Sequence, residues 1–517
     1  MPLRAAVIGA GICGLISIKQ CLDDDIEPVC FEAQGHIGGQ WRYTEPDPQT
    51  GEVVSSIYRS VVINTSRETM NMSDFPMDSK KYALYPHHTK VQEYFEEYTA
   101  FFNLRPHIRF HQKVLTVTPL PGNKWRVETV SSDGVVSEEL FDAVFVCTGH
   151  HTLPNVPEWE GVKAFENNGG QLLHSHYYRD PARFTGKKVA VVGVGNSGVD
   201  ISSELSSVAD EVHLITRSGA WVWPRFIFGR PYEAYLGRFC MTVLPTFISL
   251  FMMQMILIIA NGVIPAALKP KHSVTGAHPT VRSDLFERIE TGTVQPHRAS
   301  ISRFTETGIE LTTGEKIEPL DAVVACTGYR LTFPYIDRGI YRSSTDDGNW
   351  NHLYRMIVPP EYPTMFFIGL VQPLGAIMPV AEQQTRWATG SLLGQITLPS
   401  SATMHKHVES YKEELRRRYV TSSRHTIQVD YLDYSDILGR EIGNSIHPWR
   451  FITTFGLWQG LKTMKAAYFG APTPSQYRLF GRGSKSEVAR LAVQRVYNGP
   501  STAMSAEEKK EVGKFER

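Results

Sequence analysis

Three glycines near the start of the chain have the spacing that binds a dinucleotide. Gly9, Gly11 and Gly14 form G-x-G-x-x-G, and Glu32 follows the last of them by 18 residues. The first glycine makes a tight turn, the second lets backbone approach a pyrophosphate, and the third lets a helix pack closely on a strand. The acid stands where a carboxylate would bind a ribose hydroxyl. A chance glycine-rich turn is the alternative interpretation.

The residues around this loop predict the elements that position it. Residues 5–8 are apolar and uncharged, as a parallel strand buried on both faces requires. Residues 15–22 continue as a helix, and residues 28–31 form a second strand that ends at Glu32. The positive end of the helix then points at the phosphates. Strand, helix and acid together favour a Rossmann-type unit over a chance turn.

The chain repeats this pattern at Gly193, Gly195 and Gly198. The strand that follows, 211–215, leads to Arg217, which stands 19 residues after the last glycine. An acid there favours an unphosphorylated ribose, whereas an arginine favours a 2′-phosphate. The second unit is therefore predicted to bind NADP(H) rather than NAD(H). A solvated surface arginine is the alternative.

Two apolar runs, 141–151 and 320–329, both carry Cys-Thr-Gly near their ends. They suggest two crossings between nucleotide-binding domains, with the second domain inserted in the first. The predicted fold class is α/β, with two Rossmann-type domains and membrane-associating helical segments. The predicted parts are 1–165 and 331–445 for the first domain, 166–330 for the second, an apolar insertion at about 221–295 within the second, and an amphipathic segment with a polar tail at 446–517.

Composition narrows the class of protein. The 517 residues include 53 basic and 53 acidic side chains, so charge gives no reason to expect a nucleic-acid partner. The six cysteines form neither C-x-x-C nor a zinc pattern, so no metal site and no disulfide-reductase pair are expected. We expect a reducing compartment, and no secretory signal precedes the first strand.

Residues 240–268 carry no charged side chain and are flanked by Arg238 and Lys269. The apolar core of this segment is at the lower limit of length for a membrane span. Interfacial membrane contact, a true span and a buried core helix all remain open. Residues 448–470 mix aromatic side chains with lysines, which suits either a bilayer interface or a docking helix. The polar end, 501–517, predicts no C-terminal anchor.

From the first strand to about Arg482, the chain resembles the flavin-containing monooxygenases. The resemblance rests on G-x-G-x-x-G at 9–14, I-G-G-x-W at 37–41, the Asn64–Glu68 segment, G-x-G-N-S-G at 193–198 and Cys-Thr-Gly-Tyr at 326–329. The family fingerprint F-x-G-x-x-x-H-x-x-x-aromatic is met at Gly170, His174 and Tyr178, but Asn168 replaces its first aromatic residue and Phe165 lies three residues earlier. Ser218 also follows Arg217 where the family often has a second basic residue.

The resemblance implies FAD in the first domain and NADPH in the second. It implies a monooxygenase that acts through a C4a-hydroperoxyflavin on soft nitrogen or sulfur nucleophiles, or on ketones by Baeyer–Villiger insertion. The stretches 269–272, 278–280, 372–379 and 424–428 look most like isoform 5 of the vertebrate enzymes, which is associated with ketones. The implied partners are small lipophilic substrates, O2 and a membrane surface. The implied location is the endoplasmic reticulum membrane, with active domains facing the cytosol, and a homodimer is possible.

Other classes remain as alternatives: an NADPH oxidase that releases H2O2, a soluble-type amine N-hydroxylase, a two-dinucleotide disulfide reductase and an inactive nucleotide-binding partner. By resemblance, Asn64 is the catalytic amide beside the flavin edge and the nicotinamide; without it, a turn-forming asparagine would be preferred. His278 is a weaker candidate for steering ketone chemistry, and a structural histidine is its alternative. The predicted cofactor-binding residues are Gly9, Ala10, Gly11, Ile12, Cys13, Gly14, Glu32, Gly39, Gln40, Trp41, Asn64, Thr65, Gly193, Gly195, Asn196, Ser197, Gly198, Asp200, Thr216, Arg217, Thr327 and Gly328.

Overall fold

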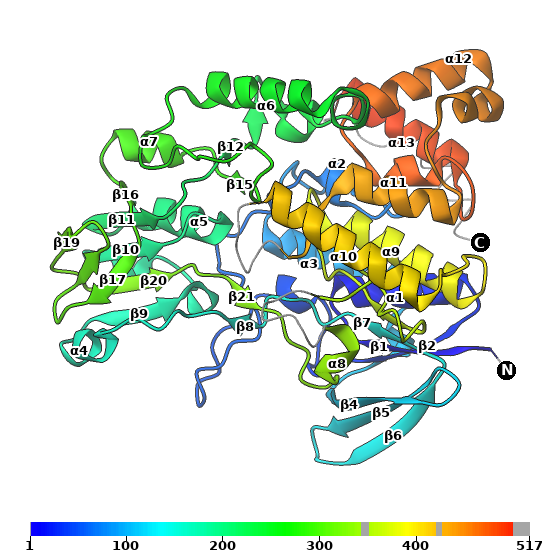
Figure 1. Ribbon diagram of the computed structural model, residues 1–517, viewed down its shortest axis with the longest axis horizontal. Helices are drawn as coiled ribbons and strands as arrows, with labels where there is room; N and C mark the ends of the chain where they lie inside the picture. The colour runs from blue at the N-terminus through cyan, green and yellow to red at the C-terminus, as the bar shows by residue number, and fades with distance from the viewer. Residues whose placement is uncertain (1, 343–350, 420–425, 500–517) are drawn as a thin grey trace.

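Two parallel sheets of five strands form the centres of the molecule, one on each side in Figure 1. The computed structural model describes residues 2–342, 351–419 and 426–499. The first sheet has the order β22-β7-β1-β2-β3, and all its pairings are parallel. Its strands are β1 (Arg4–Ile8), β2 (Glu27–Phe31), β3 (Ile108–Arg109), β7 (Ala143–Val146) and β22 (Met365–Phe367).

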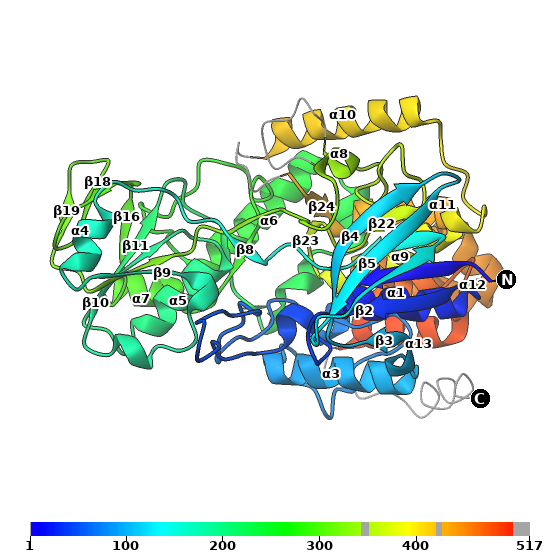
Figure 2. The ribbon, with the colours of Figure 1, turned by 90° about the horizontal axis from the view of Figure 1, so that it is seen from below.

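The second sheet has the order β16-β11-β10-β20-β9, again with parallel pairings throughout. Its strands are β9 (Gln171–His174), β10 (Lys188–Val192), β11 (Glu211–Thr216), β16 (Gln295–Arg298) and β20 (Ala322–Ala325). All of them fall within 166–330, whereas the first sheet takes strands from both sides of that range. The second unit is thus inserted in the first, as Figure 2 shows from below.

The two chain crossings between the sheets pair with each other. β8 (Leu153–Pro154) and β21 (Tyr329–Arg330) form a short antiparallel ribbon. Smaller sheets flank the two main ones: β4 (Gln112–Leu120), β5 (Lys124–Ser131) and β6 (Val136–Phe141); β17 (Ile301–Phe304), β18 (Ile309–Leu311) and β19 (Lys316–Ile317); β12 (Val222–Trp223) with β15 (Thr280–Val281); β13 (Phe226–Ile227) with β14 (Arg230–Pro231); and β23 (Gln372–Leu374) with β24 (Gln428–Asp430).

Helices pack around the sheets, with residues 246–261 and 448–469 along the top of Figure 1. They are α1 (Ile12–Asp23), α2 (Arg67–Met70), α3 (His88–Phe101), α4 (Val162–Asn167), α5 (Asn196–Leu205), α6 (Thr246–Asn261), α7 (Leu285–Glu290), α8 (Arg338–Tyr341), α9 (Ile377–Leu392), α10 (Ser401–Arg418), α11 (Tyr431–Ile442), α12 (Pro448–Phe469) and α13 (Ser486–Asn498). The predicted polar tail at 501–517 lies outside the described residues.

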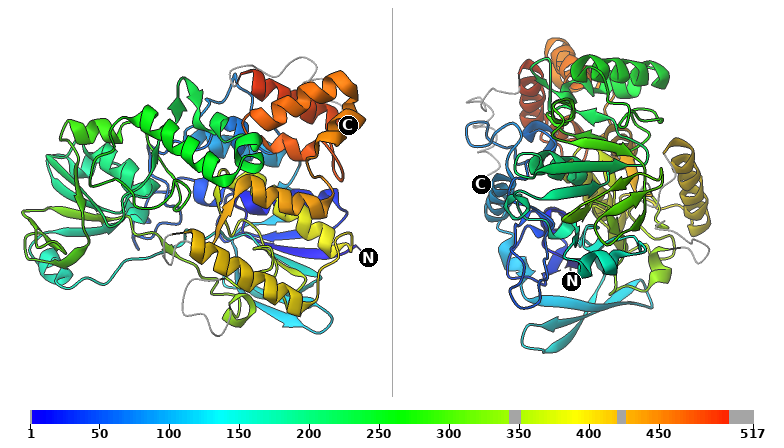
Figure 3. Two further views of the ribbon diagram at one scale, coloured as in Figure 1. Left: turned by 45° about the horizontal axis from the view of Figure 1, so that its top comes forward. Right: turned by 90° about the vertical axis from the view of Figure 1, so that its left-hand side faces the viewer.

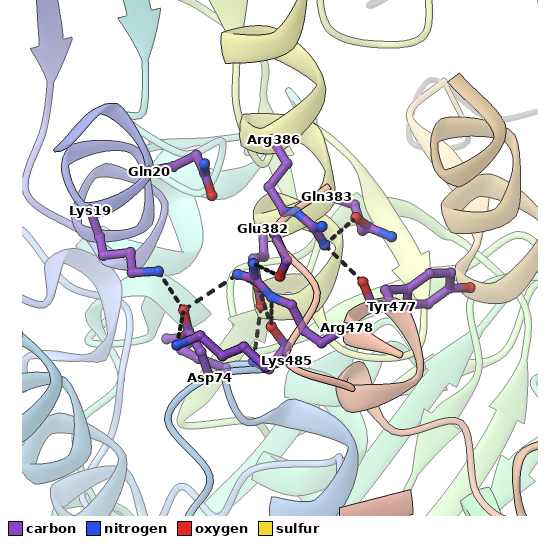
Figure 4. A network of polar contacts seen from close by, with 12 residues as sticks. Lys19, Gln20, Asp74, Glu382, Gln383, Arg386, Tyr477, Arg478 and Lys485 are labelled. Atoms are coloured by element: carbon purple, nitrogen blue, oxygen red, sulfur yellow. Dashed lines mark hydrogen bonds and ion pairs between the residues drawn. The ribbon is translucent and has the colours of Figure 1, made fainter. Parts of the chain in front are cut away.

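A buried ionic cluster fixes α1 against α9 and the segment 474–478 (Figure 4). Lys19 of α1 contacts Asp74, whose carboxylate also lies 3.3 Å from Nη2 of Arg478. Arg478 in turn binds Glu382 of α9 at 2.5 Å. These four side chains are almost completely excluded from solvent. Because each buried charge has an opposite partner, the cluster avoids the large cost of an isolated one.

The apolar segment at 240–268 contains α6, and no helix among the described residues is long and apolar enough to cross a membrane. The predicted alternative of a true span is therefore wrong. A fully buried core helix is also excluded, because α6 buries only one stripe, at Ser249, Met253 and Leu257. Phe247 and Phe251 on other faces are 73% and 64% exposed.

Candidate functional site

The first glycine loop joins β1 to α1 in the way that its spacing predicts. Gly9 has a φ of +96°, a conformation that favours glycine. A Cβ on Gly14 would lie 1.9 Å from the carbonyl oxygen of Gly9, so only glycine lets the helix pack this closely. A Cβ on Gly39 would lie 3.0 Å from the Cα of Gly11, which brings the two predicted cofactor segments together as bare backbone.

This loop has the groups that FAD requires. α1 begins at Ile12, and no side chain caps its N-terminus, so its first N–H groups can face a pyrophosphate. The carboxylate of Glu32 accepts hydrogen bonds from the backbone N–H of Ala10 at 2.7 Å and of Gln34 at 2.8 Å. Each of its oxygens keeps a lone pair for a ribose hydroxyl. The predicted residues here therefore fit the cofactor.

The neighbouring predicted residues take supporting positions. Burial raises the pKa of the Cys13 thiol to about 12, so it packs as a neutral group. Gln40 donates to the hydroxyl of Ser56, and Trp41 is half-buried against the core. All six cysteines are free thiols, which gives no support to a disulfide reductase.

The second glycine loop repeats the first but is more open. Gly193 has a φ of +110°, and a Cβ on Gly198 would lie 1.9 Å from the carbonyl oxygen of Gly193. A Cβ on Gly195 would meet nothing within 4 Å. No side chain caps α5, so its N-terminus can also accept phosphate. Asn196 accepts from the N–H of Val281 at 2.9 Å, which attaches β15 to this loop; Ser197 follows it in the first turn of α5.

The end of β11 carries the residues predicted to select the 2′-phosphate. Thr216 is buried and accepts from the N–H of Gly219 at 3.0 Å. Arg217 is exposed, and among the described residues no group forms a hydrogen bond or an ion pair with its guanidinium. Arg298 of β16 donates to the carbonyl of Ser218 at 3.2 Å, so a second guanidinium lies beside the same turn. The same guanidinium donates to the carbonyl of Lys269 at 2.6 Å, so this second basic side chain beside position 218 is held by backbone carbonyls.

Three predicted cofactor residues are engaged with protein groups between the two units. Asp200 accepts from the Tyr58 hydroxyl at 2.9 Å and lies 3.2 Å from Arg282. Thr327 donates to the carbonyl of Asn155 at 2.6 Å, and the carbonyl of Gly328 lies 3.1 Å from Nε2 of His174. These contacts hold the crossings and α5 in place.

The departure from the family fingerprint at Asn168 has a structural explanation. Phe165 is fully buried, and a Cβ on Gly170 would lie 2.4 Å from its ring. The aromatic ring therefore occupies the space beside Gly170 from three residues earlier than the pattern expects. His174 keeps its contact with Gly328, so the fingerprint still joins β9 to the second crossing.

Asn64 lies in a segment that contacts both nucleotide-binding units. Tyr58 of this segment reaches Asp200 on α5, whereas Ser73 donates its N–H to Glu382 on α9 at 3.0 Å. The side-chain oxygen of Asn64 accepts from Nη2 of Arg225 at 2.9 Å. Thr65, its neighbour, is buried.

Sequence reasoning missed the residues that surround Asn64. Arg225 and Tyr232 both contact it, the latter through a 3.1 Å hydrogen bond to the Asn64 carbonyl. Glu233 accepts from the N–H of Ser66 at 2.6 Å, and burial raises the pKa of its carboxyl. In the sequence, these residues show only as a Tyr-Glu pair that follows a glycine turn, and such a pair does not by itself predict a functional site.

A pocket of about 740 Å³, part of it open to solvent, lies between the insertion and the first unit. Its lining includes Trp223, Leu236, Met241, Val274 and Pro279 from the insertion, Thr69 of α2, the buried carboxyl of Glu233, Asp430 and Asp433, and Leu374–Ala376 just before α9. The pocket is therefore largely apolar, with carboxyl groups in its wall. His278, the predicted ketone-steering residue, immediately precedes the lining residue Pro279.

Comparisons with known proteins agree with this geometry. A sequence model described as flavin-binding monooxygenase-like matches residues 3–515. Flavin-containing monooxygenase 5 of Rattus norvegicus is 39% identical over 497 residues, which cover 93% of this chain and 89% of that protein. The Homo sapiens protein of the same name is 38% identical, with 95% and 91% covered.

Solved structures show the same fold. S-allyl-L-cysteine S-oxygenase from Allium sativum aligns with a TM-score of 0.67 and 25% identity, over 96% of this chain and 99% of that one. An open crystal structure of cyclohexanone monooxygenase aligns with a TM-score of 0.61 over 85% and 97%, and at 17% identity it supports the fold alone. With a family match over almost the whole sequence and close relatives at this level of identity, the chain belongs to the flavin-binding monooxygenase-like family.

Proposed function

We propose that this flavin monooxygenase, whose cofactors are FAD and NADPH, oxygenates small lipophilic substrates at a soft nitrogen or sulfur atom or at a ketone. The observation that carries the proposal is the position of Asn64. It lies in a segment that binds α5 of the second unit through Tyr58 and α9 of the first through Ser73. A side chain there can serve two cofactors that meet between the units.

Each unit has its own binding role in this proposal. The loop from Gly9 to Gly14, with Gly39 and Glu32, holds FAD, which when bound supplies the redox centre that activates O2. The loop from Gly193 to Gly198 holds the NADPH pyrophosphate, and Arg217 binds the 2′-phosphate. The amide of Asn64 donates a hydrogen bond toward the place where the two cofactors meet.

The apolar pocket suits the substrate and helps to exclude water from the reaction. Its lining by Trp223, Leu236 and Met241 favours lipophilic molecules. One structural relative, at 25% identity, is named for sulfur oxygenation, and two relatives at 38–39% identity are named flavin-containing monooxygenase 5, the isoform whose resemblance implies ketone substrates. Both substrate classes are therefore included in the proposal, with His278 as the candidate for steering ketone chemistry.

The test is NADPH consumption with H2O2 measured in parallel, for an amine, a sulfide and a ketone. We expect oxygenated product in preference to peroxide with at least one of them, whereas peroxide alone would make the chain an NADPH oxidase. Asn64→Ala should retain FAD and divert NADPH oxidation to H2O2. Unchanged coupling and product yield in that variant would contradict the role of Asn64.

The role of His278 has a separate test. Replacing His278 by alanine should reduce ester formation from a ketone more than oxidation of a sulfide, because only ketone insertion requires migration of a carbon group. Equal losses for both substrates would make His278 a structural residue.

We also propose that α6 and α12 bind a membrane surface together. On α12, the side chains of Trp449, Leu457 and Trp458 are 63%, 56% and 83% exposed. Large apolar side chains of α6, among them Phe247 and Phe251, are exposed as well. The ring of Phe239, just before α6, stacks on Phe469 at 4.8 Å, and both helices lie along the upper side of the molecule in Figure 3. Exposed aromatic and aliphatic side chains of this kind favour a bilayer interface. We further propose that this surface binds the endoplasmic reticulum membrane and that the protein forms a homodimer.

Co-sedimentation with phosphatidylcholine–phosphatidylserine vesicles tests the membrane surface. Phe247→Ser combined with Trp458→Ser should reduce binding by about tenfold or more, since each buried apolar side chain is worth roughly 1.5–3 kcal/mol. Leu140→Ser on β6 is the matched control, because Leu140 is 59% exposed on a different part of the molecule. Equal binding of all variants would exclude this surface.

A further inference from the structure

A short hairpin of the insertion contacts the Asn64 segment from the side of the second unit. β13 and β14 form this hairpin, and Arg225 immediately precedes it. Nη2 of Arg225 lies 2.9 Å from Oδ1 of Asn64 and 3.3 Å from the carbonyl of Val62. After the hairpin, the hydroxyl of Tyr232 donates to the backbone carbonyl of Asn64 at 3.1 Å. Side chain and backbone of Asn64 are thus both held by one segment.

The contact with Arg225 decides which way the Asn64 amide points. The oxygen and nitrogen of an amide have similar shapes, and hydrogen-bond partners normally have to distinguish them. A guanidinium can only donate, so the atom facing Arg225 must be the amide oxygen. The NH2 group of Asn64 consequently points away from Arg225 and is available as a donor.

Arg225 is itself fixed by other groups. The Tyr85 hydroxyl donates to the backbone carbonyl of Arg225 at 2.7 Å, and the backbone N–H of Arg225 donates to the hydroxyl of Ser283 at 3.2 Å. Arg225 also stabilises the ionised form of Asp200 on α5, whose pKa burial would otherwise raise further. Its backbone is therefore fixed, and its guanidinium interacts both with Asp200 of the second unit and with the Asn64 amide.

We propose that Arg225 is the positioning residue that holds Asn64 with its oxygen toward the guanidinium and its NH2 group toward the cofactors. The inference rests on the proposed role of Asn64 and deepens it, because it assigns that role to the N–H donor rather than to the amide oxygen. Without Arg225, the amide can rotate, and the donor is lost for part of the time.

Two sets of variants test the inference in the FAD-loaded protein. Asn64→Asp keeps an oxygen for Arg225 but has no NH2 group, so it should release H2O2 to the same extent as Asn64→Ala. Arg225→Met should raise the ratio of H2O2 to product by about tenfold or more, which corresponds to one lost charge-assisted hydrogen bond. Arg225→Lys, which keeps the charge but holds the amide less firmly, should fall between Arg225→Met and the natural chain.

A double variant separates positioning from an independent effect. Arg225→Met should add nothing to the uncoupling already caused by Asn64→Ala, since there is then no amide to orient. Arg230→Met, at an exposed arginine of the same hairpin, should behave like the natural chain. Arg225→Met and Asn64→Asp should change the flavin absorption band, and its perturbation by NADP+, in the same way. Arg225→Lys should leave the melting temperature of the protein unchanged.

The possible failures can be told apart. If Asn64→Ala remains coupled, the proposed role of Asn64 fails, whatever Arg225 does. If Asn64→Ala uncouples but Arg225→Met and Arg225→Lys remain coupled, the positioning role of Arg225 is wrong. Full additivity of the Arg225→Met and Asn64→Ala effects, or full coupling in Asn64→Asp, would also overturn it.

Discussion

The two glycine units share one loop geometry but differ in what surrounds it. In both, the first glycine has a positive φ, and a Cβ on the third would lie 1.9 Å from a carbonyl oxygen of the loop. Around the first loop, Gly39 faces Gly11, and Glu32 is buried at the end of the following strand. In the second unit, Gly195 faces open space, and Arg217 is exposed.

This difference matches two different tasks. A loop enclosed by a second stretch of backbone suits a cofactor that stays bound through many turnovers. An open loop with an exposed cation suits a cofactor that must enter and leave in each cycle. The helices that carry the loops differ in the same way: α1 is held by the fully buried Lys19–Asp74–Arg478 cluster, and α5 by the Asp200 contacts with Tyr58 and Arg282.

The largest expected effect comes from breaking the anchor of the first unit. Asp74→Asn leaves Lys19 and Arg478 buried without their shared carboxylate, which should lower the free energy of unfolding by about 3–5 kcal/mol at pH 7. Thermal unfolding measures the loss, with Glu138→Gln at an exposed pair as the control. A loss no larger than that of the control would show that the cluster is not an anchor.

The pH dependence of this effect has a definite sign. Burial alone would raise the pKa of Asp74, but Lys19 and Arg478 outweigh it and hold that pKa well below its usual range. The stabilisation is therefore complete above the unfolded-state pKa of about 3.9 and is lost as the pH falls below it. The difference in stability between the natural chain and Asp74→Asn should consequently begin to shrink as the pH falls below about 4, and should go on shrinking toward the lowered folded-state pKa.

The next effect compares the two loops directly. Gly14→Ala and Gly198→Ala each place a methyl group against a backbone carbonyl, so strand and helix must separate, at a cost of roughly 1–3 kcal/mol. Gly14→Ala should lose FAD, whereas Gly198→Ala should keep FAD and bind NADP+ more weakly. The ratio of flavin to protein absorbance and an NADP+ titration measure the two outcomes. Loss of FAD in both variants would mean that the units are not independent.

Local patterns predicted these two units well because each depends on residues close together in the chain. The strand expected at 5–8 is β1 at Arg4–Ile8, and the strand expected at 28–31 is β2 at Glu27–Phe31. The segment 108–115, by contrast, does not form one strand: it divides into β3, in the parallel sheet, and β4, which pairs antiparallel with β5. His111 has a φ of +56° at the break, which the apolar pattern does not reveal.

The surroundings of the candidate site could not be predicted in this way. Arg225 and Asn64 are separated by 161 positions in the chain, and their contact depends on how the insertion folds back. Asn64 itself was identified by resemblance, since a polar residue after a strand is an ordinary turn. The second guanidinium beside Ser218, that of Arg298, comes from a strand that carries no nucleotide motif.

An effect of about 1.5–3 kcal/mol, on cofactor affinity rather than on packing, is expected at the open end of the second unit. Arg217→Ala removes one charge-assisted hydrogen bond to a 2′-phosphate, so NADPH should bind about 10- to 200-fold more weakly and NADH far less so. Arg183→Ala, at an exposed arginine between β9 and β10, is the control. Equal weakening of NADPH and NADH would show that Arg217 does not read the phosphate.

The smallest effect should come from the anchor of the second unit. Burial raises the pKa of Asp200, and Arg282 and Tyr58 offset this only in part. Asp200→Asn keeps an acceptor for Arg282 and removes a buried charge, so stability at pH 7 should change by about 1 kcal/mol or less.

Because the folded-state pKa of Asp200 is raised, the natural chain gains stability as the pH falls through that pKa, and Asp200→Asn does not. Melting temperatures from pH 8 to pH 4 should therefore favour the natural chain increasingly toward acid, the opposite of the trend at Asp74. The same trend at both sites would mean that Asp200 is held as firmly as Asp74, and the contrast between a closed and an open unit would fail.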